Sequence, residues 1–248
     1  MSLNFSDIDA VVLCGGLGTR LFSVTGGKQK VIVDVYSKPF LVILIEYLFE
    51  KGFRRFIFAS GHDGKCLEEA LNFWSKDAGS DFAKELEFVF SHEAIPLGTG
   101  GALRNALKLI NSENFFVFNG DSIALFDYEE MLEFHLVKGS VATISLGTAE
   151  QNYEGGFVRA DSDGAIEGFS EKKFQSGFTF INAGAYIFNK RFIERIPLNK
   201  RVSLEQEIFP KASGRELFGY KISGDFYDIG TPERLERFRK EWKRIIAS

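Results

Sequence analysis

A short apolar run that leads into a glycine-rich turn is the feature that most restricts the fold of this chain. Residues 10–13 (Ala-Val-Val-Leu) are followed by Gly15, Gly16 and Gly18, and then by Arg20. An uninterrupted apolar run is typical of a strand covered on both faces, as in a parallel sheet flanked by helices. Glycines let backbone N–H groups surround an anion, and Arg20 adds a permanent positive charge. The segment therefore predicts a strand-to-helix turn that binds phosphate groups.

The same residues exclude two familiar phosphate-binding loops. The segment lacks the Gly-Lys-Ser/Thr ending of a Walker A loop, and Leu21 stands where a dinucleotide fingerprint has its third glycine. The alternative interpretation is a tight turn with an exposed Arg20, because short glycine motifs are weakly specific. Other parts of the chain have to decide between the two.

Composition narrows the class of protein. With 248 residues, 45% of them apolar and 27 of them Phe, the chain can bury a large core in one α/β domain or two small ones. The net charge of −4 argues against nonspecific nucleic-acid binding, which needs a basic surface. The basic residues between positions 234 and 244 alternate with glutamates, which is typical of a solvated helix face.

The start of the chain and the length of its apolar runs indicate in which cellular compartment we expect the protein. Residues 1–9 lack the basic and apolar segments of a secretion signal, and no apolar run approaches the roughly 20 residues of a membrane span. Cys14 and Cys66 have no Cys or His nearby at metal-ligand spacing. We therefore expect a cytoplasmic protein with neither a membrane nor a nucleic-acid partner.

Strand-like and helix-like patterns alternate through the first half of the chain. This alternation implies right-handed crossovers, and hence a Rossmann-like α/β fold with a mainly parallel central sheet flanked by helices. The expected strands are residues 10–13, 55–59, 86–91, 115–119 and 141–146, and the expected helices are residues 39–51, 65–76, 101–110 and 128–138.

The second half of the chain predicts a small part rich in strands. Ser203 and Gln206 form a capping-box pattern for a short helix that ends at Phe209, and Pro232 opens the last helix. No linker rich in Pro, Gly and Ser separates the halves, so we expect residues 1–248 to share one core. The expected strands are a hairpin of residues 156–160 and 165–169, a long strand at 178–188, and late strands at 217–222 and 226–229.

Two aspartates follow apolar stretches at the expected ends of strands. Asp121 ends the sequence Phe-Asn-Gly-Asp, and Asp228 ends Phe-Tyr-Asp just before the last helix. Ligands of open α/β sheets bind beyond the carboxyl ends of the strands, and carboxylates beside phosphates commonly hold Mg²⁺. Taken singly, Asp121 can be a turn residue and Asp228 a helix cap. Together they predict a magnesium site with two carboxylates.

Two further segments suit the organic parts of a substrate. The residues from Pro96 to Ala102 are poor in side chains, so a base could lie against their backbone, although a glycine-rich helix start explains them equally well. Glu171, Lys172 and Asn182 offer a carboxylate, an amine and an amide that suit a phosphorylated sugar. Surface polarity explains each of these three singly.

Taken in order, these motifs resemble the sugar-1-phosphate nucleotidyltransferases, over roughly residues 8–240. The resemblance is strongest to the guanylyltransferases that act on D-glycero-D-manno-heptose 1-phosphate, and next to those that act on mannose 1-phosphate. The motifs are Gly-Gly-x-Gly-Thr-Arg-Leu, a Lys about ten residues later, Pro-Leu-Gly-Thr-Gly-Gly-Ala, Asn-Gly-Asp, Glu-Lys, Ile-Asn-Ala-Gly and Asp-Ile-Gly-Thr-Pro-Glu.

The resemblance implies a role for each matched residue. Arg20 would contact the leaving pyrophosphate, Lys30 the α-phosphate and Lys172 the nucleophilic phosphate, while Asp121 and Asp228 would hold Mg²⁺. The residues expected to bind the nucleoside triphosphate are Leu13, Gly15, Gly16, Gly18, Thr19, Arg20, Lys30, Pro96, Gly98, Thr99 and Gly100. The residues expected to bind the sugar phosphate are Asn119, Gly156, Glu171, Lys172 and Asn182. Residues 1–150 would form the nucleotide-binding half, residues 151–230 the sugar-phosphate-binding half, and residues 231–248 a C-terminal helix.

The implied reaction joins a nucleoside monophosphate, with GTP the favoured donor, to a heptose or hexose 1-phosphate and releases pyrophosphate. A phosphate monoester with a second pKa near 6 is already largely dianionic at pH 7, so no general base is needed. That agrees with a chain of three histidines, none of which lies in the motifs. The open alternatives are thymidylyl, uridylyl or cytidylyl transfer, a glycosyltransferase, and a noncatalytic protein that binds nucleotide sugars. The oligomeric state stays open, with a homodimer as one candidate.

Three departures from the family pattern border the expected site. Gln29 and Val31 flank Lys30 where the family has two prolines, and Lys173 follows the Glu-Lys pair where the family has a third proline. Gly155 stands where the family often has Tyr. The latter two changes adjoin the expected sugar pocket, so the sugar could differ from the usual one.

Overall fold

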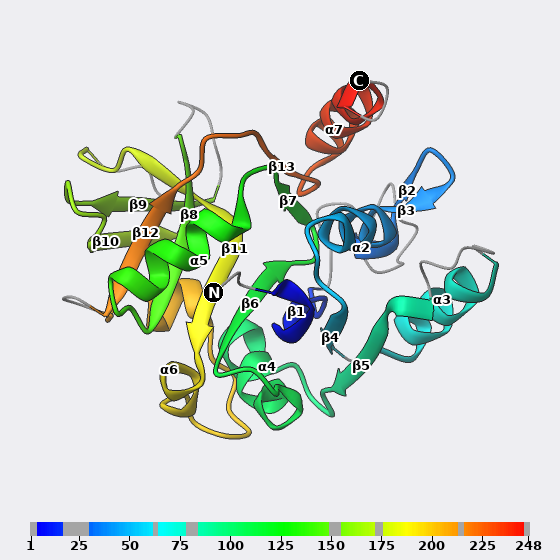
Figure 1. The fold of residues 1–248 in the computed structure, drawn as a ribbon, viewed down its shortest axis with the longest axis horizontal. Coiled ribbons are helices and arrows are strands. Elements are labelled where there is room, and N and C mark those ends of the chain that lie inside the picture. The colour runs from blue at the N-terminus through cyan, green and yellow to red at the C-terminus, as the bar shows by residue number, and fades with distance from the viewer. Residues whose placement is uncertain are drawn as a thin grey trace.

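One mixed sheet crosses the whole molecule in a computed structural model of the chain (Figure 1). The structure describes residues 4–16, 30–61, 64–77, 84–148, 155–171, 176–212 and 216–245. Within these residues, nine strands form the sheet in the order β10-β9-β11-β6-β1-β4-β5, with β8 beside β11 and β12 beside β8. The strands are β1 (Ala10–Leu13), β4 (Arg55–Ser60), β5 (Glu87–His92), β6 (Asn114–Asn119), β8 (Ala142–Thr148), β9 (Gly156–Ala160), β10 (Ile166–Glu171), β11 (Phe180–Asn189) and β12 (Leu217–Lys221).

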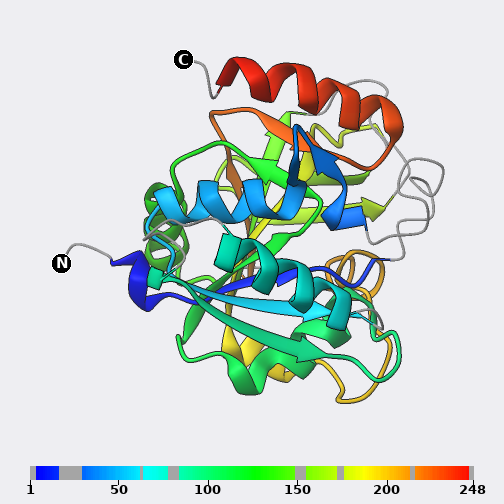
Figure 2. The same cartoon turned by 90° about the vertical axis from the view of Figure 1, so that its right-hand side faces the viewer.

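The helices cover both faces of this sheet, as the sequence predicts for the α/β class. Figure 2 shows α7 and α2 on the side of the sheet opposite α4. The helices are α2 (Phe40–Glu50), α3 (Gly64–Asp77), α4 (Gly98–Ala106), α5 (Tyr128–Val137), α6 (Lys190–Glu194) and α7 (Pro232–Ile245). No helix in the described ranges combines the length and the apolar character needed to cross a membrane.

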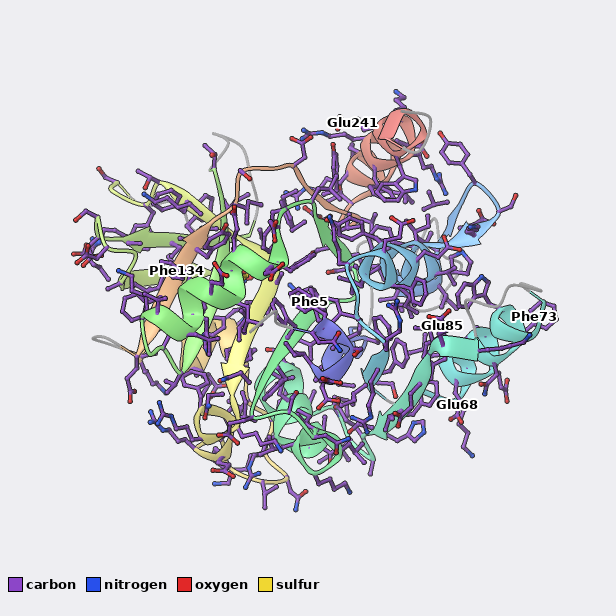
Figure 3. All side chains as sticks on the ribbon, in the orientation of Figure 1. Phe5, Glu68, Phe73, Glu85, Phe134 and Glu241 are labelled. Carbon is purple, nitrogen blue, oxygen red and sulfur yellow. The ribbon has the colours of Figure 1, made fainter. Side chains whose placement is uncertain are left out.

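Successive side chains of the central strands point alternately into two separate apolar cores, one on each face of the sheet. Val12 and Phe58 pack with α2, α3, α5 and α7 on one face, whereas Val11 and Ile57 pack with α4 and α6 on the other. Both faces are therefore dry, which explains why these strands read as continuous apolar runs. On α3, Leu67 is buried, while Phe73 is 72% exposed and points away from the sheet (Figure 3).

Parallel pairing is found at the centre of the sheet and again between β8 and β12. Strand β1 pairs in parallel with β4 and β6, and β4 with β5. The expected strand at 141–146 does not extend this series: β8 pairs antiparallel with β11, which in turn runs antiparallel to β6. The sheet is thus mainly parallel at its centre and antiparallel where the strand-rich second half joins it.

Two helices differ locally from the sequence predictions. Helix α4 begins at Gly98 and not near residue 101, since the amides of Gly100 and Gly101 donate to the carbonyl of Val202, at 2.9 and 3.2 Å. The short helix η6 (Leu204–Ile208) is a π-helix, and its wider turn moves the reciprocal capping bond from Gln206 to Glu207. The sequence also missed the small ribbon of β2 (Asp34–Val35) with β3 (Lys38–Pro39). It predicted β13 (Phe226–Asp228), as residues 226–229, but missed the strand β7 (Ser122–Ala124) that pairs with it.

Candidate active site

The glycine-rich turn and the Asn-Gly-Asp segment lie at the same edge of the sheet. Strands β1 and β6 are parallel neighbours, with Leu13 opposite Asn119, so both chains leave the sheet side by side. The amide of Gly120 donates to the carbonyl of Leu13 at 3.0 Å. A Cβ at Gly120 would lie 2.8 Å from that carbonyl oxygen, so only glycine permits this close approach. The sequence expectation that Asp121 shares an edge with the turn is therefore met in the described fold.

Lys30 reaches Asp121 at this edge. Its Nζ donates to Oδ2 of Asp121 at 2.5 Å, and the side chains of Lys30 and Asp121 are 15% and 35% exposed. Burial raises the pKa of Asp121, but the charge of Lys30 and hydrogen bonds from Lys30 and Ser122 outweigh it, so that its pKa lies below the ordinary value. The Asp121 carboxylate is thus kept ionised at neutral pH beside a cation.

Asp228 lies on the ribbon next to Asp121. Strand β13 pairs antiparallel with β7, Asp228 stands opposite Ser122, and the amide of Ile229 donates to the backbone carbonyl of Asp121 at 3.0 Å. Oδ1 of Asp228 accepts from the amide of Gly230 at 2.8 Å. Nη1 of Arg234 donates to both carboxylate oxygens of Asp228 at 3.1 Å.

Gly230 lies where these groups come closest to one another. A Cβ at Gly230 would lie 2.7 Å from Oδ1 of Asp228, and 3.6 Å from both Nζ of Lys30 and Nη1 of Arg234. Two carboxylates and two cations therefore gather around one point, although the four residues are drawn from three distant parts of the sequence.

The donor set fits a magnesium ion that arrives with a polyphosphate. Asp228 on β13 and Asp121, directly before the partner strand β7, supply hard oxygen ligands. Mg²⁺ in nucleotide sites typically takes one or two carboxylates plus phosphate oxygens. Within the described ranges, no cluster of three or more His, Cys, Asp or Glu side chains could hold a metal by itself. A magnesium ion bound here would therefore need oxygen ligands from the substrate in addition to those of Asp121 and Asp228.

A cavity of about 270 Å³ opens beside Lys30 and Asp121. We name it the nucleotide cavity, because the residues that line it include nine with a predicted role, most of them at the expected triphosphate site. They are Leu13, Gly15, Gly16, Lys30, Pro96, Gly98, Thr99, Asn119 and Asp121. Gly100 does not line this cavity; it packs against Val202, and a Cβ there would lie 3.2 Å from the Val202 carbonyl oxygen.

The wall formed by residues 96–101 is fixed by the segment before η6. Gly98 has a φ of +70°, and a Cβ there would lie 2.6 Å from the carbonyl oxygen of Val202. Oγ1 of Thr99 donates to Oε2 of Glu205 at 2.7 Å and accepts from the amide of Leu204 at 2.9 Å. The glycines of this segment therefore serve close backbone packing, and Glu205 joins the cavity wall.

Glu93 is a buried carboxylate in the nucleotide cavity that sequence reasoning missed. It follows β5 at the same edge of the sheet, is 8% exposed, and its Oε2 accepts from the amide of Leu97 at 2.7 Å. Burial raises the pKa of Glu93, and the Leu97 hydrogen bond lowers it by less. A carboxylate directly after a strand is the signal that also marked Asp121, and it could have identified Glu93.

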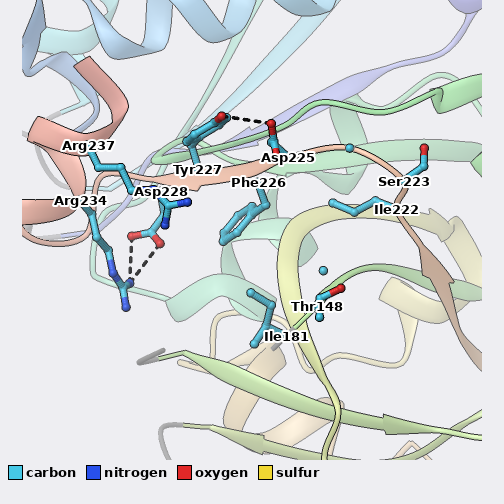
Figure 4. Close-up of a pocket in the computed structure, with 12 residues that line it drawn as sticks. Thr148, Ile181, Ile222, Ser223, Asp225, Phe226, Tyr227, Asp228, Arg234 and Arg237 are labelled. Carbon is cyan, nitrogen blue, oxygen red and sulfur yellow. Dashed lines mark hydrogen bonds and ion pairs between the residues drawn. The ribbon is translucent and has the colours of Figure 1, made fainter. Parts of the chain in front are cut away.

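A second cavity, of about 450 Å³, is lined by Asp228 (Figure 4). We name it the acceptor cavity. Its walls are the end of β8, Ile181 at the start of β11, the segment from Ile222 to Asp228, and Arg234 and Arg237 of α7. Ile181 pairs with Gly147 on one side and with Phe157 on the other, so the hairpin β9–β10 adjoins this cavity.

The residues expected to bind the sugar phosphate fall into two groups. Asn119 and Asn182 come together on the hydroxyl of Tyr186, with amide nitrogens 3.4 and 2.7 Å from it. Gly156 and Glu171 pair across the hairpin β9–β10, where a Cβ at Gly156 would lie 3.2 Å from Oε2 of Glu171. Tyr186 was missed by sequence reasoning because its buried ring reads as a core residue. Gly18, Thr19, Arg20 and Lys172 lie outside the described residues.

Comparison with known proteins decides the family. The nucleotidyl transferase family profile matches residues 9–244. The chain belongs to the nucleotidyl transferase family. Over 227 residues it is 36% identical to the Drosophila melanogaster mannose-1-phosphate guanylyltransferase catalytic subunit beta, covering 90% of this chain and 60% of that one. Over 243 residues it is 32% identical to the Mycobacterium tuberculosis mannose-1-phosphate guanylyltransferase, covering 97% of this chain and 66% of that one.

Solved structures agree with this membership of the nucleotidyl transferase family. HddC from Yersinia pseudotuberculosis superposes with a TM-score of 0.81 at 35% identity, covering 95% of this chain and 99% of that one. The same protein has been solved in complex with GMP-PN, and that structure gives a TM-score of 0.80. The chain spans only about 60% of the length of the fly relative.

Proposed function

We propose that this nucleotidyl transferase moves a nucleoside monophosphate, from GTP by preference, to a heptose or hexose 1-phosphate. The products are a nucleotide-diphospho-sugar and pyrophosphate. The observation that carries the proposal is the cluster of Lys30, Asp121 and Asp228, in which Lys30 and Asp121 line the nucleotide cavity and Asp228 lines the acceptor cavity. A donor in one cavity and an acceptor in the other would meet at these charges.

The chemistry needs alignment and charge neutralisation more than proton transfer. The acceptor's phosphate is largely dianionic at neutral pH, so its oxygen can attack the α-phosphorus without a base. Lys30, whose Nζ donates to Asp121 and lies 3.6 Å from where a Cβ of Gly230 would stand, is placed to neutralise the charge that develops on the α-phosphate. We assign Arg20 to the leaving pyrophosphate and Lys172 to the nucleophilic phosphate. Bound Mg²⁺ would supply charge neutralisation at the phosphates, held by Asp121 and Asp228.

Glu93 supports guanine as the base. The Glu93 carboxyl oxygens lie in the nucleotide cavity, and Oε2 already accepts from the amide of Leu97. Guanine alone among the four common bases presents two neighbouring donors, N1–H and the N2 amino group, on one edge. Uracil and thymine present a single N–H between two carbonyls, which would face the Glu93 oxygens as acceptors. A buried carboxylate in the nucleotide cavity therefore favours GTP. The names of the relatives, which are guanylyltransferases, agree.

A manno-configured sugar is the best supported acceptor class. The sequence motifs resemble enzymes for manno-heptose and mannose 1-phosphates, and the fly and mycobacterial relatives are named for mannose 1-phosphate. The departures at Gly155 and Lys173 fall beside the hairpin and its end, where they would affect the sugar more than the nucleotide.

A panel of substrates tests this proposal. Four nucleoside triphosphates are each combined with mannose, glucose and D-glycero-D-manno-heptose 1-phosphates in the presence of Mg²⁺, and pyrophosphate release is measured. We expect GTP with a manno-configured acceptor to give the highest kcat/KM. Nucleotide binding without pyrophosphate release from any pair would instead support the noncatalytic alternative, and release of a nucleoside diphosphate from a nucleotide sugar would support a glycosyltransferase.

A further inference from the structure

The acceptor cavity is lined by positively charged side chains to which the sequence analysis assigns no role. Among the described residues that line it, the positively charged ones are Arg234 and Arg237, one helical turn apart on α7. Nε of Arg237 donates to Oε1 of Glu241 at 3.1 Å, and the Arg237 side chain is 55% exposed. Arg234 is only 22% exposed and faces Asp228 (Figure 4). Arg234 is therefore the inner cation of this cavity.

The position of Arg234 in the chain is unfavourable for a cation. Helix α7 begins at Pro232, which places Arg234 in the first turn, where the unpaired amides give the helix a partial positive charge. Acidic residues are favoured there, and a basic one costs about 0.3–1 kcal/mol. A residue that contradicts the local preference at a site is a candidate for function. The same helix end favours a bound anion.

Arg234 and Lys30 both lie close to one point beside Asp228, and they line different cavities. A Cβ at Gly230 would be 3.6 Å from Nη1 of Arg234 and 3.6 Å from Nζ of Lys30. Lys30 lines the nucleotide cavity, and Arg234 lines the acceptor cavity. Two phosphates that are about to be joined need one cation each at this short separation, and the structure provides such a pair.

We propose that Arg234 binds the phosphate of the acceptor sugar 1-phosphate and sets its position beside the α-phosphorus; this inference rests on the proposed function. Asp228 holds the guanidinium in place in the structure, and a phosphate dianion competes for it because it carries more charge than a carboxylate. The same exchange would make the Asp228 oxygens available to hold Mg²⁺. Arg234 thereby couples the acceptor to the carboxylate pair.

The kinetic test uses Arg234→Gln, Arg234→Lys and the control Lys240→Gln, which removes one positive charge from an exposed residue of α7 that does not line the acceptor cavity. With GTP and mannose 1-phosphate, or the best acceptor of the panel, we expect Arg234→Gln to raise the acceptor KM by roughly 10- to 100-fold. The GTP KM should stay within about twofold, because Lys30 and the nucleotide cavity are untouched. Arg234→Lys should recover part of the loss, and Lys240→Gln should change the acceptor KM by less than about threefold.

Binding separates this inference from the proposed function. Mannose 1-phosphate is titrated calorimetrically into chain saturated with Mg²⁺ and a GTP analogue that carries a methylene between its α- and β-phosphates. Weaker acceptor binding in Arg234→Gln, with unchanged melting temperature, supports the assignment whether or not the wild type turns over. An unchanged acceptor affinity and KM would overturn it, as would equal losses for GTP and acceptor with a lowered melting temperature, which a purely structural role predicts. A wild type that binds the acceptor but releases no pyrophosphate would overturn the proposed function alone.

Discussion

Lys30 and Asp121 are 91 residues apart in the sequence, yet Nζ of Lys30 lies 2.5 Å from Oδ2 of Asp121. The contact joins the segment before α2 to the carboxyl end of β6. It places a cation and a carboxylate at the boundary of the nucleotide cavity, next to the ribbon that carries Asp228. The first predictions concern this pair.

Asp121→Asn should reduce Mg²⁺-dependent turnover by about 10²- to 10³-fold, the usual loss when one preorganised charge is removed from an active site. Circular dichroism and melting temperature should stay close to those of the wild type, because Asn keeps the size of the side chain. Pyrophosphate release measures the turnover. Asp163→Asn, in the exposed turn of the hairpin β9–β10, is the control and should retain full activity. Undiminished turnover in Asp121→Asn would remove this residue from the metal site.

Lys30→Ala should lower kcat by more than it raises the KM for the triphosphate, since Lys30 is expected to stabilise charge that develops in the transition state. Lys38→Ala removes the same charge from an exposed lysine that pairs with Glu46, and it should leave both constants unchanged. Steady-state kinetics at saturating acceptor separate the two constants. A rise in KM with an unchanged kcat would mean that Lys30 only binds the nucleotide.

Glu93→Gln should reduce the preference for GTP over the other triphosphates by about 10- to 200-fold, the range for one mispaired buried polar group. Gln keeps one carbonyl oxygen for the amide of Leu97, so the loop beside it should hold its place. The preference is measured as the ratio of kcat/KM for GTP to that for ATP, UTP and CTP. A ratio equal to that of the wild type would show that Glu93 serves the loop and not the base.

Gly98→Ala should destabilise the fold by about 2–4 kcal/mol through a positive φ together with a clash. Gly139→Ala is the matched control, because Gly139 also has a positive φ, of +59°, but a Cβ there would meet no atom within 4 Å. We expect the control to cost about 1 kcal/mol, the backbone effect alone. Urea unfolding measures both, and equal losses would mean that contact with Val202 costs nothing.

His135 should make stability depend on pH between pH 5 and 7. It is 1% exposed, lies against Thr143 and Asn114, and burial followed by the charge of Arg191 lowers its pKa from 6.5 to about 4. The unfolded chain therefore binds one more proton than the folded chain in this range, so the free energy of unfolding falls as the pH falls.

The expected loss from pH 7 to pH 5 is about 2 kcal/mol, at about 1.4 kcal/mol for each unit below the unfolded pKa. Urea titrations at several pH values measure the loss. His135→Gln should flatten this dependence, and a slope identical to that of the wild type would show that another group is responsible.

Much of the sheet could be predicted because its evidence is local. Residues 10–13 and 55–59 are uniformly apolar, since each face of these strands packs against helices, and the structure confirms both strands. The strands β2, β3 and β7 were missed, because two- and three-residue strands carry no periodic pattern, whereas β13 was predicted as part of the apolar stretch 226–229. The antiparallel pairing of β8 with β11 could not be predicted either, because tertiary packing, and not the strand's own residues, determines which strands pair.

The sequence by itself determined the family and the residue types that phosphate chemistry requires, because glycine turns and strand-end carboxylates are local patterns that survive without coordinates. Only the tertiary structure decided which charges meet. Glu93 lines the nucleotide cavity because β5 ends beside that cavity. Arg234 contacts Asp228 because β13, which carries Asp228, leads directly into α7. Neither residue belongs to a phosphate motif, and contacts between distant segments are set by the folded backbone.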